Sequence, residues 1–353
     1  MSTSSTQPAA ASPLVVRAAA PRTVPTPAPV AGLVWRPLTL ADATALTALV
    51  GRVEDADEPP YRTSPDEVLE WLEGSWKDLA RDTLGAVEPD GTLRAFGFAE
   101  VSPGDVSIIR AYLHGGVDPA RRGQGIGRGL LHWLDARGRQ LLVESGRDAP
   151  ARLMTFLEND SEAERRLYAA GGFAPRRWYT TMRRDLATPS PQASLASGLR
   201  LVPWGEELDD AVRLAHNEAF ADHWGSQPRT AEQWRSGRPA FAPGWSFAVL
   251  DDDAAEDGRP AVAGYLMSAR FEHDWPVRGY TFGYVSQLGV RRPWRGRGVA
   301  VALLAAAMDA YRADGLEHAV LDVDTENPTG AHGLYARVGF EPTSGSVMYS
   351  IEI

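Results

Sequence analysis

The sequence contains no cysteine, and Lys77 is its only lysine. Without cysteine the chain forms no disulfide bond and no thioester intermediate of its own, and it lacks the ligand that structural zinc sites use most. Because Lys77 is far from any glycine-rich turn, a Gly-Lys-Ser/Thr phosphate loop is absent. No apolar run approaches the ~20 residues of a membrane-spanning helix. We therefore expect a cytoplasmic protein with no membrane partner.

The composition is that of a globular protein with room for two domains. The chain has 353 residues, of which 44% are hydrophobic and 23% are charged. Its net charge of −10 argues against nucleic acid as a partner. An acidic surface suits an amine-bearing small molecule, although solubility explains the same charge equally well.

The clearest local pattern is a glycine-rich turn between a predicted strand and a predicted helix. Residues 280–290 are rich in aromatic and β-branched side chains, which predicts a strand. From Val301 onward, apolar residues recur at helical spacing. The turn holds Gly296 and Gly298 among arginines and contains no acid. Free backbone N–H groups at a helix start bind anions, and glycine lets a pyrophosphate approach the backbone closely.

The chain carries this pattern twice, since residues 116–127 form a similar turn before an amphipathic helix. The two turns read Arg122-x-x-Gly125-x-Gly127 and Arg295-x-x-Gly298-x-Ala300. In this motif the chain resembles the GNAT acetyltransferases, in which the turn holds the pyrophosphate of acetyl-coenzyme A (acetyl-CoA). The second turn is followed by a predicted strand at 319–324, Asn327, Leu334-Tyr335 and Gly339-Phe340. The first is followed by a strand at 153–156, Asn159, Leu167-Tyr168 and Gly172-Phe173. The near-constant spacing between equivalent residues indicates a tandem duplication.

These patterns predict an α/β fold in four segments. Residues 1–31 are rich in Ala, Pro, Ser and Thr, which predicts a disordered tail. Residues 32–186 and 198–353 are predicted to be two tandem GNAT-like domains, each a mixed, mostly antiparallel sheet flanked by helices. Residues 187–197 have the composition of a linker. In the second domain we expect an acidic turn at 252–259 between two strands.

The resemblance implies which residues contact the coenzyme. In the second copy they are Leu288, Gly289, Val290, Arg295, Gly296, Arg297, Gly298, Val299, Ala300 and Asn327. In the first copy they are Val117, Arg122, Gly123, Gln124, Gly125, Ile126, Gly127 and Asn159. Backbone N–H groups around residues 288–290 would hold the thioester carbonyl. We expect acetyl-CoA as the cosubstrate, with up to one molecule in each domain.

The resemblance also implies the groups that move protons. A tyrosine acid is matched by Tyr335, and the carboxylate that some members carry five residues before the asparagine is matched by Asp322. The first copy has Met154 at the carboxylate position, so we expect catalysis in the second domain. From the residues alone, Tyr335 fits core packing equally well, and Asp322 fits a solvent-facing strand residue. The tandem form resembles the mycothiol synthases, but their glutamate on the strand before the turn is replaced here by Tyr284.

The acceptor is expected to contact the helix at 208–220 and the Trp-rich segment after it. Glu218 and Asp222 share a helix face and suit an ammonium group, with Trp224 and Tyr284 as further contacts. A solvated helix face explains the two charges equally well. No compact set of ligands is present in this segment, so we predict no metal site.

We therefore expect an N-acetyltransferase that transfers an acetyl group from acetyl-CoA to a primary amine of a small molecule, by direct attack in a ternary complex. Two alternatives remain open at this point. One is a non-catalytic sensor that binds acyl-CoA. The other is a protein N-terminal or lysine acetyltransferase, which requires an open groove rather than a closed pocket. The sequence leaves monomer and homodimer equally open.

Overall fold

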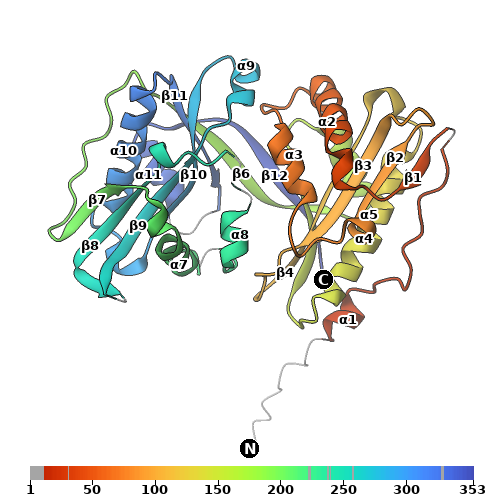
Figure 1. The fold of residues 1–353 in the computed structure, drawn as a ribbon, viewed down its shortest axis with the longest axis horizontal. Coiled ribbons are helices and arrows are strands. Elements are labelled where there is room, and N and C mark those ends of the chain that lie inside the picture. The colour runs from red at the N-terminus through yellow and green to blue at the C-terminus, as the bar shows by residue number, and fades with distance from the viewer. Residues whose placement is uncertain are drawn as a thin grey trace, which may run out of the picture.

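One continuous sheet runs through both halves of the molecule (Figure 1). The structure is a computed structural model that describes residues 12–30, 32–221, 224–236, 238, 240–256, 258–326 and 330–353. In this part of the chain twelve strands lie in the order β1-β2-β3-β4-β5-β12-β6-β11-β10-β9-β8-β7. Among the described strands only β4 with β5 and β10 with β11 pair in parallel. The predicted α/β fold with a mixed, mostly antiparallel sheet is confirmed.

The helices and strands follow the order expected for a tandem repeat. The strands of the first half are β1 (Val34–Arg36), β2 (Thr83–Val87), β3 (Leu93–Val101), β4 (Ile109–Val117), β5 (Ala151–Glu158) and β6 (Ala174–Asp185). Those of the second half are β7 (Leu199–Pro203), β8 (Phe247–Glu256), β9 (Arg259–Ala269), β10 (Phe282–Val290), β11 (His318–Asp324) and β12 (Glu341–Glu352). The helices are α1 (Leu14–Arg17), α2 (Ala43–Asp57), α3 (Pro65–Leu72), α4 (Leu79–Asp82), α5 (Ile126–Glu144), α6 (Glu162–Ala170), α7 (Asp209–Ala219), α8 (Ala231–Arg235), α9 (Trp275–Arg278), α10 (Val299–Ala313) and α11 (Ala331–Arg337). A search of the described residues finds no helix with the length and hydropathy needed to cross a bilayer.

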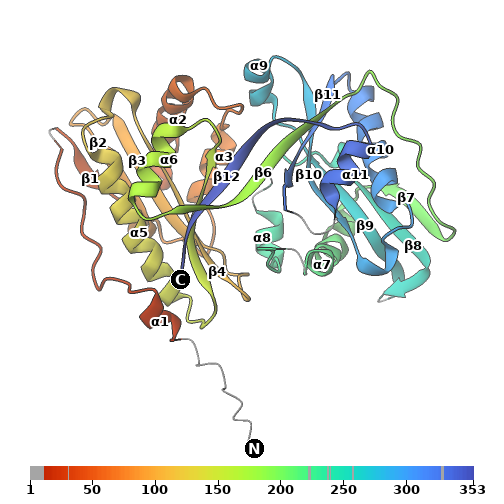
Figure 2. The ribbon, with the colours of Figure 1, turned by 180° about the vertical axis from the view of Figure 1, so that it is seen from behind.

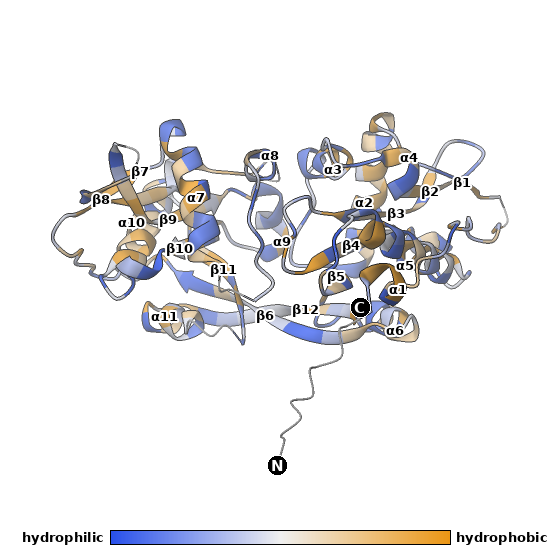
Figure 3. Ribbon diagram, turned by 90° about the horizontal axis from the view of Figure 1, so that it is seen from below, coloured by the Kyte–Doolittle hydropathy of each residue, from blue (hydrophilic) through white to orange (hydrophobic). Residues whose placement is uncertain are grey.

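The two copies exchange strands at the centre of the sheet. Strand β6 of the first half lies between β12 and β11 of the second half, and β12 lies between β5 and β6. The β6–β11 pairing is antiparallel and runs from Asp185 opposite His318 to Tyr179 opposite Asp324. Figures 2 and 3 show β6 and β12 crossing together from one half to the other. The two predicted domains therefore do not have separate sheets, because each contributes a strand to the other.

Helices cover both faces of the sheet in each half. In the first half, alternate residues of β3 point to opposite faces, so Phe96 and Phe98 pack against α2 and α3. Ala99 on the other face packs in the cluster of α5. The second half repeats the arrangement, with Tyr265 of β9 facing α7 and Leu266 facing α10. This layering places α7 and α8 next to the junction between the halves.

Two expectations from the sequence are corrected. The predicted disorder of residues 1–31 is wrong for residues 12–30, since Leu14 is only 2% exposed and Arg17 donates hydrogen bonds to the carbonyls of Ala149 and Ile353. Residues 1–11 and 31 lie outside the described residues. The acidic turn expected at 252–259 is shorter, because β8 extends to Glu256 and β9 begins at Arg259. Acidic side chains are accommodated in this segment because Asp252 and Asp253 are exposed to solvent. The predicted linker, residues 187–197, contains no helix or strand.

Candidate active site

The parallel strands β10 and β11 separate shortly after they start. They pair only over Phe282–Tyr284 and His318–Val320, so in the part of the chain that the structure describes the later part of β10 has no strand partner on that side. In its pairing with β9, β10 also carries an irregularity between Val285 and Gln287. The equivalent strand β4 pairs with β3 without any shift of register. Backbone N–H groups that face this side near the end of β10 are therefore available to a ligand, whereas the carbonyl of Val290 accepts from Arg295.

The turn after β10 has the geometry that its glycines predict. Gly296 and Gly298 adopt φ of 74° and 83°, a left-handed conformation that favours glycine. A Cβ on Gly298 would also lie 2.2 Å from the carbonyl oxygen of Ser194. Arg295 holds the turn by donating to the carbonyls of Val290 (3.1 Å) and Ala219 (3.0 Å). Between the described residues no hydrogen bond is donated by the backbone N–H groups of residues 296–300, which leaves them available to an anion.

The first turn has the same backbone but a different charge. Gly123 and Gly125 again have positive φ, and Arg122 Nε donates to the carbonyl of Val117 (3.2 Å). However, the Arg122 guanidinium forms an ion pair with Asp57, with 2.5 Å between Nη1 and Oδ1. Its neighbour, Arg121, pairs with Glu88 in the same way. In the second turn the described residues place no carboxylate within ion-pair distance of Arg295. Among the described residues, only the second turn therefore keeps an arginine, Arg295, without a carboxylate partner.

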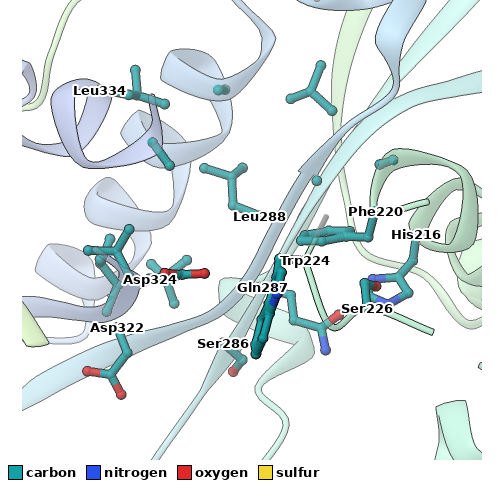
Figure 4. A pocket seen from close by; sticks show the side chains of 18 of the residues that line it. His216, Phe220, Trp224, Ser226, Ser286, Gln287, Leu288, Asp322, Asp324 and Leu334 are labelled. Atoms are coloured by element: carbon teal, nitrogen blue, oxygen red, sulfur yellow. The ribbon is translucent and has the colours of Figure 1, made fainter. Parts of the chain in front are cut away.

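A single cavity of about 930 Å³ connects the second turn with β10, β11, α11 and the loop after α7 (Figure 4). In Figure 4, Asp322 and Asp324 lie on one side of Leu288 and Gln287, and His216 and Phe220 lie on the other. Twelve residues predicted from the sequence line this cavity. They are Trp224, Tyr284, Leu288, Gly289, Val290, Arg295, Gly296, Gly298, Val299, Ala300, Asp322 and Tyr335.

The other predicted residues are placed elsewhere. Glu218 is bound by Arg291, with 2.6 Å between Oε2 and Nη2, and it does not line the cavity. Arg297 extends towards Asp251, 3.8 Å away. Asp222 and Asn327 lie outside the described residues. The predicted contacts of the first copy do not line this cavity, and Asn159 uses its backbone N–H to bond to the carbonyl of Gly345.

Asp322 and Tyr284 form a polar pair in the wall of the cavity. The Tyr284 hydroxyl donates to Oδ2 of Asp322 over 2.9 Å. No cation of the described chain lies within ion-pair distance of Asp322, whereas neighbouring Asp324 is buried and paired with Arg177. Burial, followed by the charge of Asp322, raises the pKa of Tyr284 well above its usual value. Tyr284 therefore stays protonated and holds one oxygen of the Asp322 carboxylate in place.

The equivalent tyrosines of the two copies have different environments. Tyr335 is partly exposed and lines the cavity, and burial raises the pKa of its hydroxyl to about 12. It is therefore protonated at neutral pH and able to donate a proton to a nearby anion. Tyr168 is buried and packs edge-on against Phe173, with 5.3 Å between ring centroids. Tyr335 also packs edge-on, against Phe340 with 5.9 Å between ring centroids, so packing describes both tyrosines and Tyr335 in addition lines the cavity.

Several cavity residues were not predicted from the sequence. Tyr112 of β4 and Tyr179 of β6 come from the first half, and Arg229 comes from the loop before α8. Trp224 was predicted, but its ring is held between Arg152 and Arg177, at 4.5 and 4.6 Å from the ring centroid. No local pattern identifies these residues, since only the strand exchange brings β6 to this cavity.

His216 lies in the same wall in a closed environment. It is 5% exposed, and its Nδ1 lies 2.5 Å from the hydroxyl of Tyr265. Burial, with a smaller contribution from the charge of Arg229, lowers the pKa of the imidazole to about 3. His216 is therefore neutral at physiological pH and packs the helix α7 against β9.

Comparison with known proteins agrees with this geometry. The model of the acetyltransferase (GNAT) family matches residues 210–340. A mycothiol acetyltransferase of Thermobispora bispora is 32% identical over 260 residues, which cover 72% of this chain and 79% of that protein. One of Streptomyces scabiei is 30% identical over 320 residues, which cover 89% and 93%. A GCN5-related N-acetyltransferase from Sphaerobacter thermophilus superposes with a TM-score of 0.64 at 26% identity, covering 92% of this chain and 97% of that one. A tandem GNAT protein from the clavulanic acid biosynthesis pathway has the same fold, with a TM-score of 0.61 at 18% identity and coverage of 91% and 98%. The chain belongs to the GNAT family of acetyltransferases.

Proposed function

We propose that this protein transfers an acetyl group from acetyl-CoA to a primary amine of a small molecule, and that the second half carries out the reaction. The observation that carries the proposal is the single cavity described above. It joins an uncompensated anion-binding turn to a carboxylate, Asp322, and to a protonated tyrosine, Tyr335. The mycothiol acetyltransferases among its relatives support a small-molecule acceptor rather than a protein.

In the proposed reaction the amine attacks the thioester carbon in a ternary complex. The new C–N bond forms as the C–S bond breaks, and backbone N–H groups of residues 288–290 stabilise the carbonyl oxygen. Asp322, directly or through a water molecule, accepts the proton that leaves the amine. Tyr335 donates its proton to the departing thiolate and recovers one from solvent. The coenzyme supplies the activated acetyl group, and its pyrophosphate is assigned to the turn at 295–300.

The ion pairs of the first turn favour one coenzyme molecule per chain. In the first half, Asp57 and Glu88 already occupy the arginines of the turn. A pyrophosphate bound there would lie close to these carboxylates, which disfavours binding. The first half then acts as a structural partner that supplies part of the cavity wall.

Titration calorimetry with acetyl-CoA tests the proposal, using two matched variants. Arg295→Gln is expected to weaken binding by roughly 10- to 100-fold, because a charge-assisted contact is lost. Arg122→Gln is the equivalent change in the first turn and is expected to leave both the affinity and a stoichiometry of one unchanged. Acetyl-CoA binding without release of free thiol in the presence of an amine panel would instead favour the acyl-CoA sensor.

A further inference from the structure

Arg229 places a positive charge in the cavity that no described acid compensates. It lies between α7 and α8 and lines both the main cavity and an adjoining one of about 280 Å³. Within the described chain no carboxylate lies within ion-pair distance of its guanidinium, and no acceptor receives a hydrogen bond from it. Arg110, in the same wall, is by contrast fully engaged, since it pairs with Asp105 and donates to the carbonyl of Gly225.

The surroundings of Arg229 make this charge available to a ligand. Its charge is close enough to affect the pKa values of His216, Tyr265 and Tyr112, which line or adjoin the cavity. Desolvation by these neighbours lowers the pKa of the Arg229 guanidinium, although an arginine remains protonated at neutral pH. The side chain is nonetheless exposed, so its charge faces the open cavity. Because the guanidinium lines the cavity and has no counter-ion among the described residues, an anionic ligand would gain a charge-assisted hydrogen bond there.

The opposite charge in this cavity is at the reacting end. Asp322 has no cationic partner in the described chain and faces the same space. Glu218, which the sequence assigned to an ammonium group, is turned to Arg291 instead. The acceptor side therefore has a negative end at Asp322 and a positive end at Arg229. An acceptor molecule with no acidic group would leave Arg229 without an ionic partner among the described residues.

We propose that the acceptor amine carries an anionic group, a carboxylate or a phosphate, and that Arg229 binds it. This inference rests on the proposed acetyl transfer, because it names the class of acceptor that the same site takes. The anionic group would anchor the molecule while its amine reaches the thioester carbon. Arg229 is then a specificity-determining residue and takes no part in proton transfer.

Steady-state kinetics with three amines of similar size test this assignment. β-Alanine carries a carboxylate and O-phosphoethanolamine carries a phosphate. β-Alaninamide has an uncharged amide in place of the carboxylate. The wild-type protein is expected to prefer an anionic amine, and the comparison of the first two tells which anion fits. Arg229→Gln is expected to reduce that preference in kcat/KM by roughly 10- to 100-fold, mainly through KM, because a hydrogen-bonded charge contact is lost. Arg229→Lys is expected to recover part of the preference.

Arg235→Gln serves as the control. Arg235 is exposed on α8, its Nε bonds to the carbonyl of Ala231, and it does not line either cavity. The control should keep the wild-type preference. Equal kcat/KM for anionic and neutral amines, or an equal loss for all three amines in Arg229→Gln, would overturn the assignment.

A binding measurement separates this inference from the proposed function. Calorimetry with N-acetyl-β-alanine and N-acetyl-O-phosphoethanolamine needs no turnover. Arg229-dependent binding without any thiol release would support the anion site and refute the acetyl transfer. Turnover of β-alaninamide without any binding of the two anionic compounds would refute the anion site and support the transfer. Failure of both compounds to bind, with no turnover, would refute the anion site as well.

Discussion

Substitutions at Asp322 and Tyr284 test the proposed chemistry, because the expected loss of kcat/KM depends on the role of Asp322. If Asp322 accepts the proton of the amine, Asp322→Asn removes a positioned base, and kcat/KM should fall by roughly 10²- to 10⁴-fold. If Asp322 only anchors Tyr284, the asparagine oxygen can still accept the 2.9 Å hydrogen bond, and the variant loses at most the strength that the negative charge gives this bond. Such a bond contributes about 1.5–3 kcal/mol, or roughly 10- to 100-fold at most. The two roles therefore predict different sizes of effect.

Tyr284→Phe is the matched variant, because it removes the same hydrogen bond and keeps the carboxylate. We expect it to lower kcat/KM by about tenfold, clearly less than Asp322→Asn. The assay follows free thiol released from acetyl-CoA between pH 6 and 9, with acetyl-CoA affinity measured separately. Asp322→Asn should also change the shape of the pH profile and leave coenzyme affinity unchanged. Equal losses in the two variants, with an unchanged pH profile, would refute Asp322 as the base.

Two further predictions concern the junction between the halves. Burial and the nearby Asp322 raise the pKa of Glu158 from 4.5 to about 7, so its contribution to stability is present below pH 4.5 and is lost as the pH rises through 7. Glu158→Gln should therefore be more stable than the wild type above pH 7, by at most about 3 kcal/mol in the free energy of unfolding. At pH 4 the two proteins should be equally stable. Thermal unfolding at several pH values will check both expectations. A fragment of residues 198–353 lacks β6 and is expected to unfold without cooperativity, whereas 174–353 keeps the partner strand of β11 and β12. Circular dichroism melts compare the two fragments, and a cooperative transition of 198–353 at the temperature of the full chain would contradict the importance of the exchange.

The anion-binding turns could be predicted because their geometry depends on local sequence. Gly296 and Gly298 adopt positive φ, and glycine is the residue that does so without strain. The flanking strand and helix follow from apolar periodicity over short windows. The difference in charge between the turns was not predictable, because Asp57 and Glu88 meet the first turn only through tertiary folding.

The strand exchange could not be predicted from the sequence, for a different reason. Alternation of side chains identifies a strand but not its neighbour, and β6 and β12 are both compatible with either half. The observed β6 runs from Ala174 to Asp185. Its twelve residues span roughly 40 Å when extended, enough to run through both halves. Tyr179 could not be predicted as a cavity residue for the same reason, because it reaches the cavity only on the exchanged strand.

The exchange gives a physical reason why a second half that carries the proposed site needs the first half. Acids neutralise its turn, its tyrosine Tyr168 is packed in the core, and its strand β4 lacks the irregularity of β10. Yet β6 is the strand that pairs with β11, and this pairing fixes the position of Asp322. Removing the first half would therefore leave the proposed base on an unpaired edge and open one wall of the cavity. In the proposed function the first copy therefore supports the site of the second, since the sheet that positions Asp322 belongs to both halves.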